Sequence, residues 1–178
     1  MMSDELNSLI TLFNGLFKES CNTVLVKGDD EPIYLPADKE FPHHRVIFAH
    51  GFFASAMHEI SHWCIAGERR RQLVDFGYWY KPDGRSAAEQ LEFEQVEVKP
   101  QALEWMLSQA AGHKFHFSAD NLGSELGASD GFKQQVLAQI YCYLHDGLPD
   151  RPAQLIAAFN DHYQTSQLSK DDFSLEGR

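Results

Sequence analysis

Apolar and polar positions follow a helical period at the start of the chain. After a potential serine cap at Ser3, apolar side chains recur at steps of three and four residues: Leu6, Leu9, Ile10, Phe13, Leu16 and Phe17. This spacing is typical of an amphipathic helix with one buried face. We therefore predict a helix over Asp4–Phe17.

Short β-prone runs come next. Thr23–Val26 and Ile33–Leu35 are separated by the turn-forming residues Gly28–Asp30, and nearby prolines bound them. This pattern predicts a hairpin. We expect Pro42–Arg45 to be a loop, and Val46–Phe48 to be either a third strand or the entry to the next helix.

The middle of the chain predicts a second helix and a further strand. The helix should run over Phe52–Ala66, with Gly67 in the left-handed conformation that often ends a helix. Val74–Tyr80 is rich in β-branched and aromatic residues, which favours a strand. The turn residues Lys81–Gly84 should end that strand.

The second half of the chain is mainly helical in pattern. A long helical stretch covers Ser86–Ala111, where Pro100 must either begin a second helix or kink a single one. Gly112–Gly131 is rich in Gly, Ser and Asp and is predicted to be a loop. Two further helices are predicted at Phe132–His145 and Pro152–Tyr163.

The pattern as a whole predicts the α+β class, as a single domain over residues 1–178 that is mostly helical with a small β-sheet. The polar tail after Thr165 should fray. The chain has 178 residues, the usual size of one domain, and shows no internal repeat or low-complexity tract.

Charge and cysteine content narrow the possible partners. The formal net charge is −11, from 15 Lys and Arg against 26 Asp and Glu, which argues against nucleic acid and membrane surfaces as partners. Arg69–Arg71 is the one run where an acidic partner could dock. Cys21, Cys64 and Cys142 lack the pairing of a disulfide scaffold, and the first residues lack a signal-peptide pattern. We expect a cytoplasmic protein.

The candidate chemistry lies in a His-Glu-x-x-His motif, His58–His62. Residues His58 and His62 are one helical turn apart, so both imidazoles can reach one ion. In zinc hydrolases with this motif the glutamate, here Glu59, is the general base that activates metal-bound water. The alternative is a pair of structural core histidines. We favour metal binding because the surrounding helix is largely apolar, and two imidazoles in it need a specific reason.

A third ligand has to come from elsewhere in the chain. The richest source is the acidic stretch that holds Glu92, Glu94 and Glu97. We predict Glu97 rather than Glu94, because Gln101 follows four residues later and could orient a ligand histidine. His50 is a weaker candidate, since its apolar surroundings could bury it as a core histidine.

Two histidines and one carboxylate bind non-haem iron(II) in oxygenases and zinc in hydrolases, and the spacing does not separate the two metals. The run Val74–Tyr80 places Asp75 on one side of a strand and Tyr78 and Tyr80 on the other. Such an aromatic wall beside a carboxylate would suit a long aliphatic amine. We therefore name these three residues as candidate substrate contacts, against the alternative of an ordinary half-buried strand.

The segment around the motif also resembles a known family. His50–Gly67 is similar to the signature region of bacterial elongation factor P hydroxylases. The same holds for Arg70–Tyr80, Pro82–Arg85, Phe93–Trp105 and Gly147–Ala158. The resemblance covers most of the chain and is weakest at its two ends.

This resemblance implies a hydroxylase that adds a hydroxyl group to the β-lysylated lysine of translation elongation factor P. It implies a metal site with His58, His62 and Glu97 as ligands, iron(II) as the metal and molecular oxygen as co-substrate, although zinc or another divalent ion could occupy the site in purified protein. It also implies a fold similar to small metallohydrolases. We identify no arginine pocket for 2-oxoglutarate, because Arg85 and the other arginines could equally be surface residues.

Two alternatives remain open at this point. The first is a zinc-dependent metallopeptidase or another hydrolase with this motif, in which Glu59 activates water and Glu97 is again a ligand. The second is a metal-free protein that docks a translation factor, in which His58 and His62 are only structural. Metal content separates the first from a hydroxylase, and insensitivity to chelators would favour the second.

Overall fold

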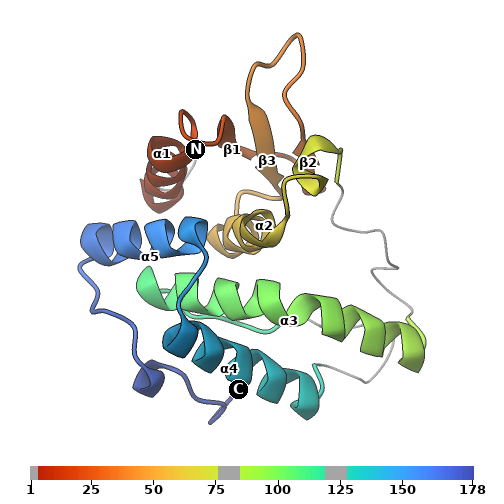
Figure 1. Cartoon of the computed structure of the whole chain (residues 1–178), viewed down its shortest axis with the longest axis vertical. Helices are drawn as coiled ribbons and strands as arrows, with labels where there is room; N and C mark the ends of the chain where they lie inside the picture. Colours follow the sequence, from red (N-terminus) through yellow and green to blue (C-terminus); the bar gives the residue numbers. More distant parts are fainter. Residues whose placement is uncertain (1–3, 76–84, 119–127) are drawn as a thin grey trace. The chain divides into compact units, whose positions relative to one another are not determined.

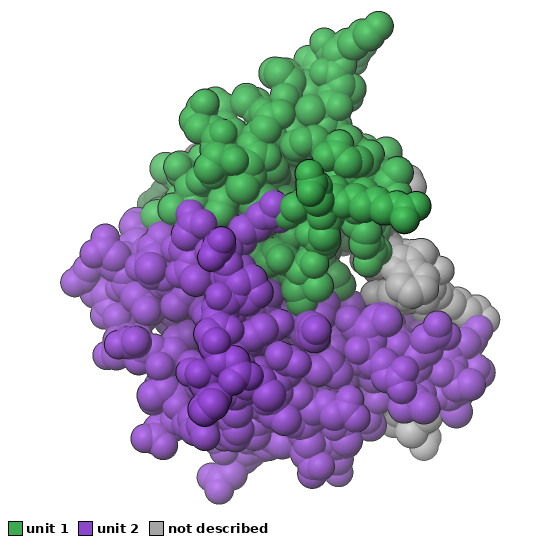
Figure 2. Space-filling model, in the orientation of Figure 1, with its two compact units in different colours: residues 1–77 green, residues 78–178 purple. Residues whose placement is uncertain are grey.

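The computed structural model describes residues 4–75, 85–118 and 128–178. The chain divides into two compact units, Met1–Gly77 and Tyr78–Arg178, here called the N-terminal and C-terminal units (Figure 2). The described residues form five α-helices and one three-stranded sheet, which confirms the α+β class. That residues 1–178 work as one hydroxylase domain stays a prediction.

Helix α1 spans Asp4–Phe17, as its apolar period predicts. Leu6, Leu9, Phe13 and Phe17 are buried, and their spacing puts them on one face of the helix. This face packs in the core of the N-terminal unit, where α1 contacts the sheet.

The sheet consists of β1 (Thr23–Lys27), β2 (Ile33–Leu35) and β3 (His44–Phe48), in the order β1-β3-β2. Strand β3 runs parallel to β1 and antiparallel to β2. The predicted hairpin of the first two strands is therefore wrong. The third strand takes the central place, with β1 on one side and β2 on the other, and it carries the buried Val46 and Phe48.

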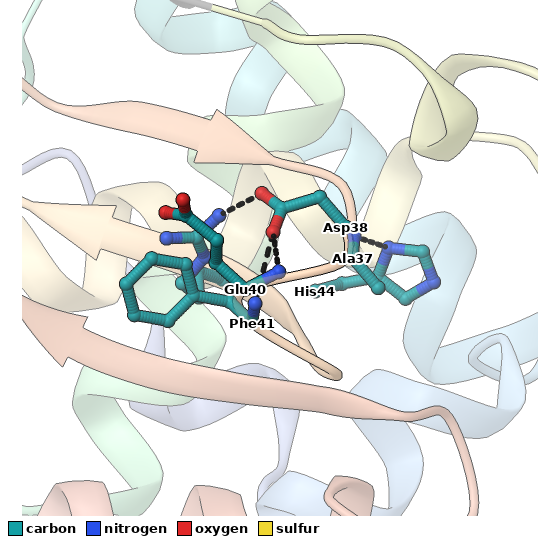
Figure 3. Close-up of polar contacts among 6 residues, drawn as sticks. Ala37, Asp38, Glu40, Phe41 and His44 are labelled. Carbon is teal, nitrogen blue, oxygen red and sulfur yellow. Dashed lines mark hydrogen bonds and ion pairs between the residues drawn. The ribbon is translucent and has the colours of Figure 1, made fainter.

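The loop before β3 is ordered by one carboxylate (Figure 3). Asp38 accepts hydrogen bonds from the backbone N–H groups of Glu40 and Phe41 at 2.8 and 2.9 Å, and from the guanidinium of Arg45 at 3.0 Å. The two backbone hydrogen bonds are the main reason why the pKa of Asp38 is lowered. The guanidinium also lies over the ring of Phe41. Residues 42–45, predicted as loop, are thus partly strand.

His44 opens β3 and holds the preceding loop. Its Nδ1 accepts a hydrogen bond from the backbone N–H of Ala37 at 3.0 Å, and its ring stacks on Tyr34. Burial lowers the pKa of His44 below its usual value of 6.5. The neutral imidazole is therefore the form that this contact requires, because Nδ1 must carry a free electron pair to accept a hydrogen bond.

Helix α2 spans Phe53–Ile65, one residue shorter at each end than predicted. At its end Ala66 has φ −57° and ψ 121°, and Gly67 has no positive φ, so the predicted left-handed residue is absent. The left-handed residues lie instead before the helix, at His50 and Gly51. The chain therefore turns sharply into α2 and leaves it in an extended conformation.

An aromatic cluster fixes α2 against α1. The Trp63 ring lies edge-on to Phe13 and Phe17, with centroid distances of 5.1 and 4.9 Å. Aromatic pairs of this geometry contribute about 0.5–1.5 kcal/mol each beyond the area they bury. The cluster sets the rotation of α2 about its axis, and with it the face on which the histidines lie.

Helix α3, the longest of the C-terminal unit, spans the 24 residues Ala87–Ala110. It is one continuous helix with Pro100 inside it, so the two-helix alternative is wrong. Its start is closed by a capping box, in which Ser86 accepts the backbone N–H of Glu89 and the Glu89 carboxylate accepts that of Ser86.

Helices α4 (Asp130–Asp146) and α5 (Asp150–Tyr163) both lie against α3 (Figure 1). Each begins two residues earlier than predicted. Gly147 has φ 98° and ends α4 in a conformation that favours glycine.

The C-terminal tail is packed, so the prediction that it frays is wrong. After a short 3-10 turn, Phe173 is buried with its ring edge-on to Trp105. The guanidinium of Arg178 donates to the carbonyl of Phe115 at 2.7 Å and lies over the same tryptophan ring. Phe173 and Arg178 thus anchor this mainly polar segment.

The predicted strand Val74–Tyr80 and turn Lys81–Gly84 lie mostly outside the described residues. Of the strand, Asp75 pairs with Tyr34 as an isolated antiparallel bridge. Within the part of the chain that the structure describes, no helix is long and apolar enough to cross a membrane.

Candidate metal centre

His58 and His62 lie on α2 with their ring centroids 4.7 Å apart. Both are half-buried, next to a buried face formed by Met57, Ile60 and Ser61. The one-turn spacing thus brings the two imidazoles together as predicted. Glu59 is half-buried on the same helix.

A stripe of polar side chains runs along α3, each less than a tenth exposed. The spacing alternates between four and three residues, so these side chains share one helix face. We call this set the buried polar stripe: Gln90, Glu94, Glu97, Gln101, Glu104 and Ser108. Sequence reasoning singled out part of it and missed its extent, although the same period that reveals apolar faces could have found it.

Glu97 is 1% exposed, and its carboxylate accepts a hydrogen bond from the side-chain amide of Gln101 at 3.2 Å. The amide oxygen of Gln101 in turn accepts the backbone N–H of Ser118 at 3.1 Å. We predicted that Gln101 orients a histidine, and this is wrong. Its amide instead bonds to the carboxylate of Glu97 and to the backbone of Ser118.

Glu94 has a different set of partners. Its carboxylate accepts the hydroxyl and the backbone N–H of Ser129, at 2.8 and 3.1 Å. The Ser129 hydroxyl also accepts the backbone N–H of Phe132, so it caps α4. Glu94 therefore holds the start of α4, which favours Glu97 as the ligand of the two.

Among the described residues, one group of His, Cys, Asp or Glu side chains could hold a metal ion. One donor atom each from His58, His62 and Glu97 lie within 4.8 Å of one another. Two imidazole nitrogens and a carboxylate oxygen suit divalent ions such as iron(II) and zinc. A carboxylate as buried as that of Glu97 also needs strong donors or a cation, because burying a charge is costly. The donor set therefore fits a divalent metal.

His50 is not part of this group. Its side chain is exposed, its φ is 58°, and its backbone N–H donates to the carbonyl of Asp29. The expectation that apolar neighbours could bury it in the core is therefore wrong. The left-handed backbone of the turn before α2 places the His50 side chain at the surface instead.

The candidate substrate contacts are only partly described. Asp75 is half-buried, and its carboxylate accepts a hydrogen bond from the guanidinium of Arg70 at 3.1 Å. Tyr78 and Tyr80 lie outside the described residues. Arg85, which the sequence left as either a surface or a pocket residue, is buried.

Arg85 contacts two side chains of α3. Its Nε donates to the side-chain oxygen of Gln90 at 2.7 Å, and its guanidinium lies over the ring of Phe93 at 4.0 Å. This arginine thus extends the buried polar stripe at its N-terminal end.

Comparison with known proteins decides the family. The family described as elongation factor P hydroxylase matches this chain over residues 12–173. The chain belongs to the elongation factor P hydroxylase family. A protein of Haemophilus influenzae named elongation factor P lysine hydroxylase is 52% identical over 174 residues, which cover 98% of this chain and 96% of the relative. The resemblance seen in the sequence is thereby confirmed, and the match to elongation factor P hydroxylases spans both α2 and α3.

Proposed function

We propose that this protein hydroxylates a lysine side chain of elongation factor P, using a metal ion bound by His58, His62 and Glu97. The observation that carries the proposal is the 52% identity, over nearly the whole chain, to a relative named elongation factor P lysine hydroxylase. Iron(II) as the metal, molecular oxygen as co-substrate and the β-lysylated lysine as target are further parts of the proposal.

The described geometry supports the metal site. His58 and His62 present two imidazoles from one helix face, with ring centroids 4.7 Å apart. Glu97 supplies a nearly fully buried carboxylate whose charge a divalent cation would balance. Glu94, the competing carboxylate, is already engaged with Ser129.

The reaction converts a C–H bond of the substrate into C–O–H. With dioxygen as the oxidant, one oxygen atom enters the substrate and the other is reduced to water. This reduction uses two electrons from an external reductant and two protons. When bound, iron(II) provides the site at which dioxygen can be reduced. Glu59 follows His58 in the sequence and is half-buried on the same helix. We propose that its carboxylate holds a proton near the metal.

We propose that carboxylates of this acidic chain recognise the ammonium groups of the substrate. A β-lysylated lysine carries ammonium groups on long apolar stems, and the chain has a net charge of −11. We propose that Asp75 pairs with one ammonium group, with its carboxylate oriented by Arg70. Tyr78 and Tyr80 are proposed to pack against the methylenes.

The test is a reaction with purified elongation factor P in its β-lysylated and unmodified forms. With iron(II), a reductant and oxygen, we expect a gain of one oxygen atom on the modified factor and little change on the unmodified one. Omitting iron and adding a chelator should abolish the gain. Cleavage of a peptide or ester bond with zinc, and no oxygen gain with any metal, would favour the hydrolase alternative instead.

A further inference from the structure

Gln101 is fully buried in the middle of α3, where its side-chain amide bonds to a carboxylate on one side and to a backbone N–H group on the other. Its amide nitrogen donates to Oε2 of Glu97 at 3.2 Å. Its amide oxygen accepts the backbone N–H of Ser118 at 3.1 Å. The side chain thus links the candidate ligand carboxylate to the segment that follows α3.

The orientation of the amide follows from its two partners. The two ends of a glutamine amide are hard to tell apart by shape, so their assignment has to rest on hydrogen bonding. A backbone N–H can only donate and an ionised carboxylate can only accept. The oxygen must therefore face Ser118, and the NH₂ group must face Glu97. No flipped amide satisfies both partners.

We propose that Gln101 is a positioning residue that fixes the orientation in which Glu97 offers its carboxylate to the metal. The N–H donated to Oε2 of Glu97 occupies one lone pair of that oxygen and holds the carboxylate plane in one orientation. A metal ion at the proposed site would then meet the carboxylate in that orientation. This inference rests on the proposed metal site and adds to it how the third ligand is oriented.

The anchor on Ser118 matters as much as the contact with Glu97. A glutamine side chain that is free to rotate would lose conformational entropy each time it contacted the carboxylate. The backbone N–H of Ser118 fixes it beforehand. Glu97 is therefore held by a preorganised donor.

The buried polar stripe offers a matched control. Glu94 is one turn before Glu97, is also buried, and also contacts a serine, but it anchors α4 through Ser129. Changing Glu94 should lower stability without changing the surroundings of Glu97. A change at Gln101 and a change at Glu94 therefore separate a positioning role from a general packing role.

The experiment measures cobalt(II) binding by the visible absorption of the bound ion, whose bands report on the geometry of its ligands. In Gln101→Met, which keeps the length of the side chain but has no amide, we expect cobalt affinity to fall about 10- to 100-fold and the bands to shift. In Glu94→Gln we expect wild-type affinity and bands with a lower unfolding midpoint. Thermal unfolding of each variant without metal shows whether it is folded.

Gln101→Glu gives a second, independent reading if the methionine variant does not fold. It keeps the acceptor for Ser118 but loses the N–H donated to Glu97, so the cobalt bands should again differ from those of the wild type. Wild-type bands and affinity in a folded Gln101 variant would overturn the positioning role. If His62→Ala binds cobalt like the wild type, or the wild type binds none, the metal site itself is wrong.

Discussion

Ser129 donates both its hydroxyl and its backbone N–H to the carboxylate of Glu94, whereas Glu97, one turn further along α3, receives the amide of Gln101. Two glutamates that look alike in the sequence thus have different partners. The first holds the start of α4, and the second accepts a hydrogen bond from a buried amide. This difference in partners is the reason why we propose Glu97 rather than Glu94 as the metal ligand.

Glu94→Ala should therefore lower stability and leave metal binding intact, whereas Glu97→Ala should abolish metal binding. Loss of the Glu94 carboxylate removes the contact with Ser129, and we expect the free energy of unfolding to fall by about 1–2 kcal/mol with metal binding intact. Loss of Glu97 should abolish tight metal binding. Urea unfolding and metal analysis measure the two effects. Loss of metal in the Glu94 variant alone would move the ligand one turn earlier.

His58→Ala and His62→Ala should each remain folded and lose bound metal. Both side chains are half-buried, so the packing of α2 on α1 through Trp63, Phe13 and Phe17 should persist. The measurement is metal content per chain after anaerobic loading with iron(II), with circular dichroism as the control for folding. A variant that still binds one metal ion per chain would remove its histidine from the site.

Glu59→Gln tests the kind of chemistry. A hydrolase uses this carboxylate as a general base, which is worth about a hundredfold or more in rate. A hydroxylase that uses dioxygen does not need it to activate water, so we expect the variant to keep its metal and part of its activity. Complete loss of turnover with the metal intact would support water activation instead.

His44 should make the stability of the N-terminal unit depend on pH. Its pKa in the folded chain is below the usual value of 6.5, so the unfolded chain binds the proton more readily. Its contribution is fully present above pH 6.5 and is lost as the pH falls from there through the folded-state pKa. His44→Asn keeps an acceptor for the N–H of Ala37 without titrating, so urea unfolding should show a shallower loss of stability over this range. An unchanged slope would contradict this assignment.

Local patterns predicted the helices well. Helix α1 has the predicted bounds, and α2 differs by one residue at each end, because a helical period and its caps are properties of neighbouring residues. The closeness of His58 and His62 was predicted from the same local geometry, because residues four apart on a helix share one face. The predicted hairpin failed because strand pairing depends on residues distant in sequence, and the turn residues Gly28–Asp30 do not show that β3 will lie between β1 and β2.

The parts of the site that depend on distant residues could not be predicted. Nothing local tells that Ser129 donates to Glu94 or that the backbone N–H of Ser118 donates to Gln101, since these contacts join the stripe on α3 to segments that follow it in the chain. The packed tail has the same origin, because Phe173 finds its place against Trp105. A long-range partner is visible only once the chain is folded.

The most direct test of the central claim follows the source of the added oxygen. The wild-type protein is loaded with iron(II) and incubated with β-lysylated elongation factor P, a reductant and isotopically labelled dioxygen in ordinary water, and the intact mass of the factor is measured. We predict the gain of one labelled oxygen atom, and no gain with His62→Ala. An unchanged mass, or a factor cut at a peptide bond, would contradict the account.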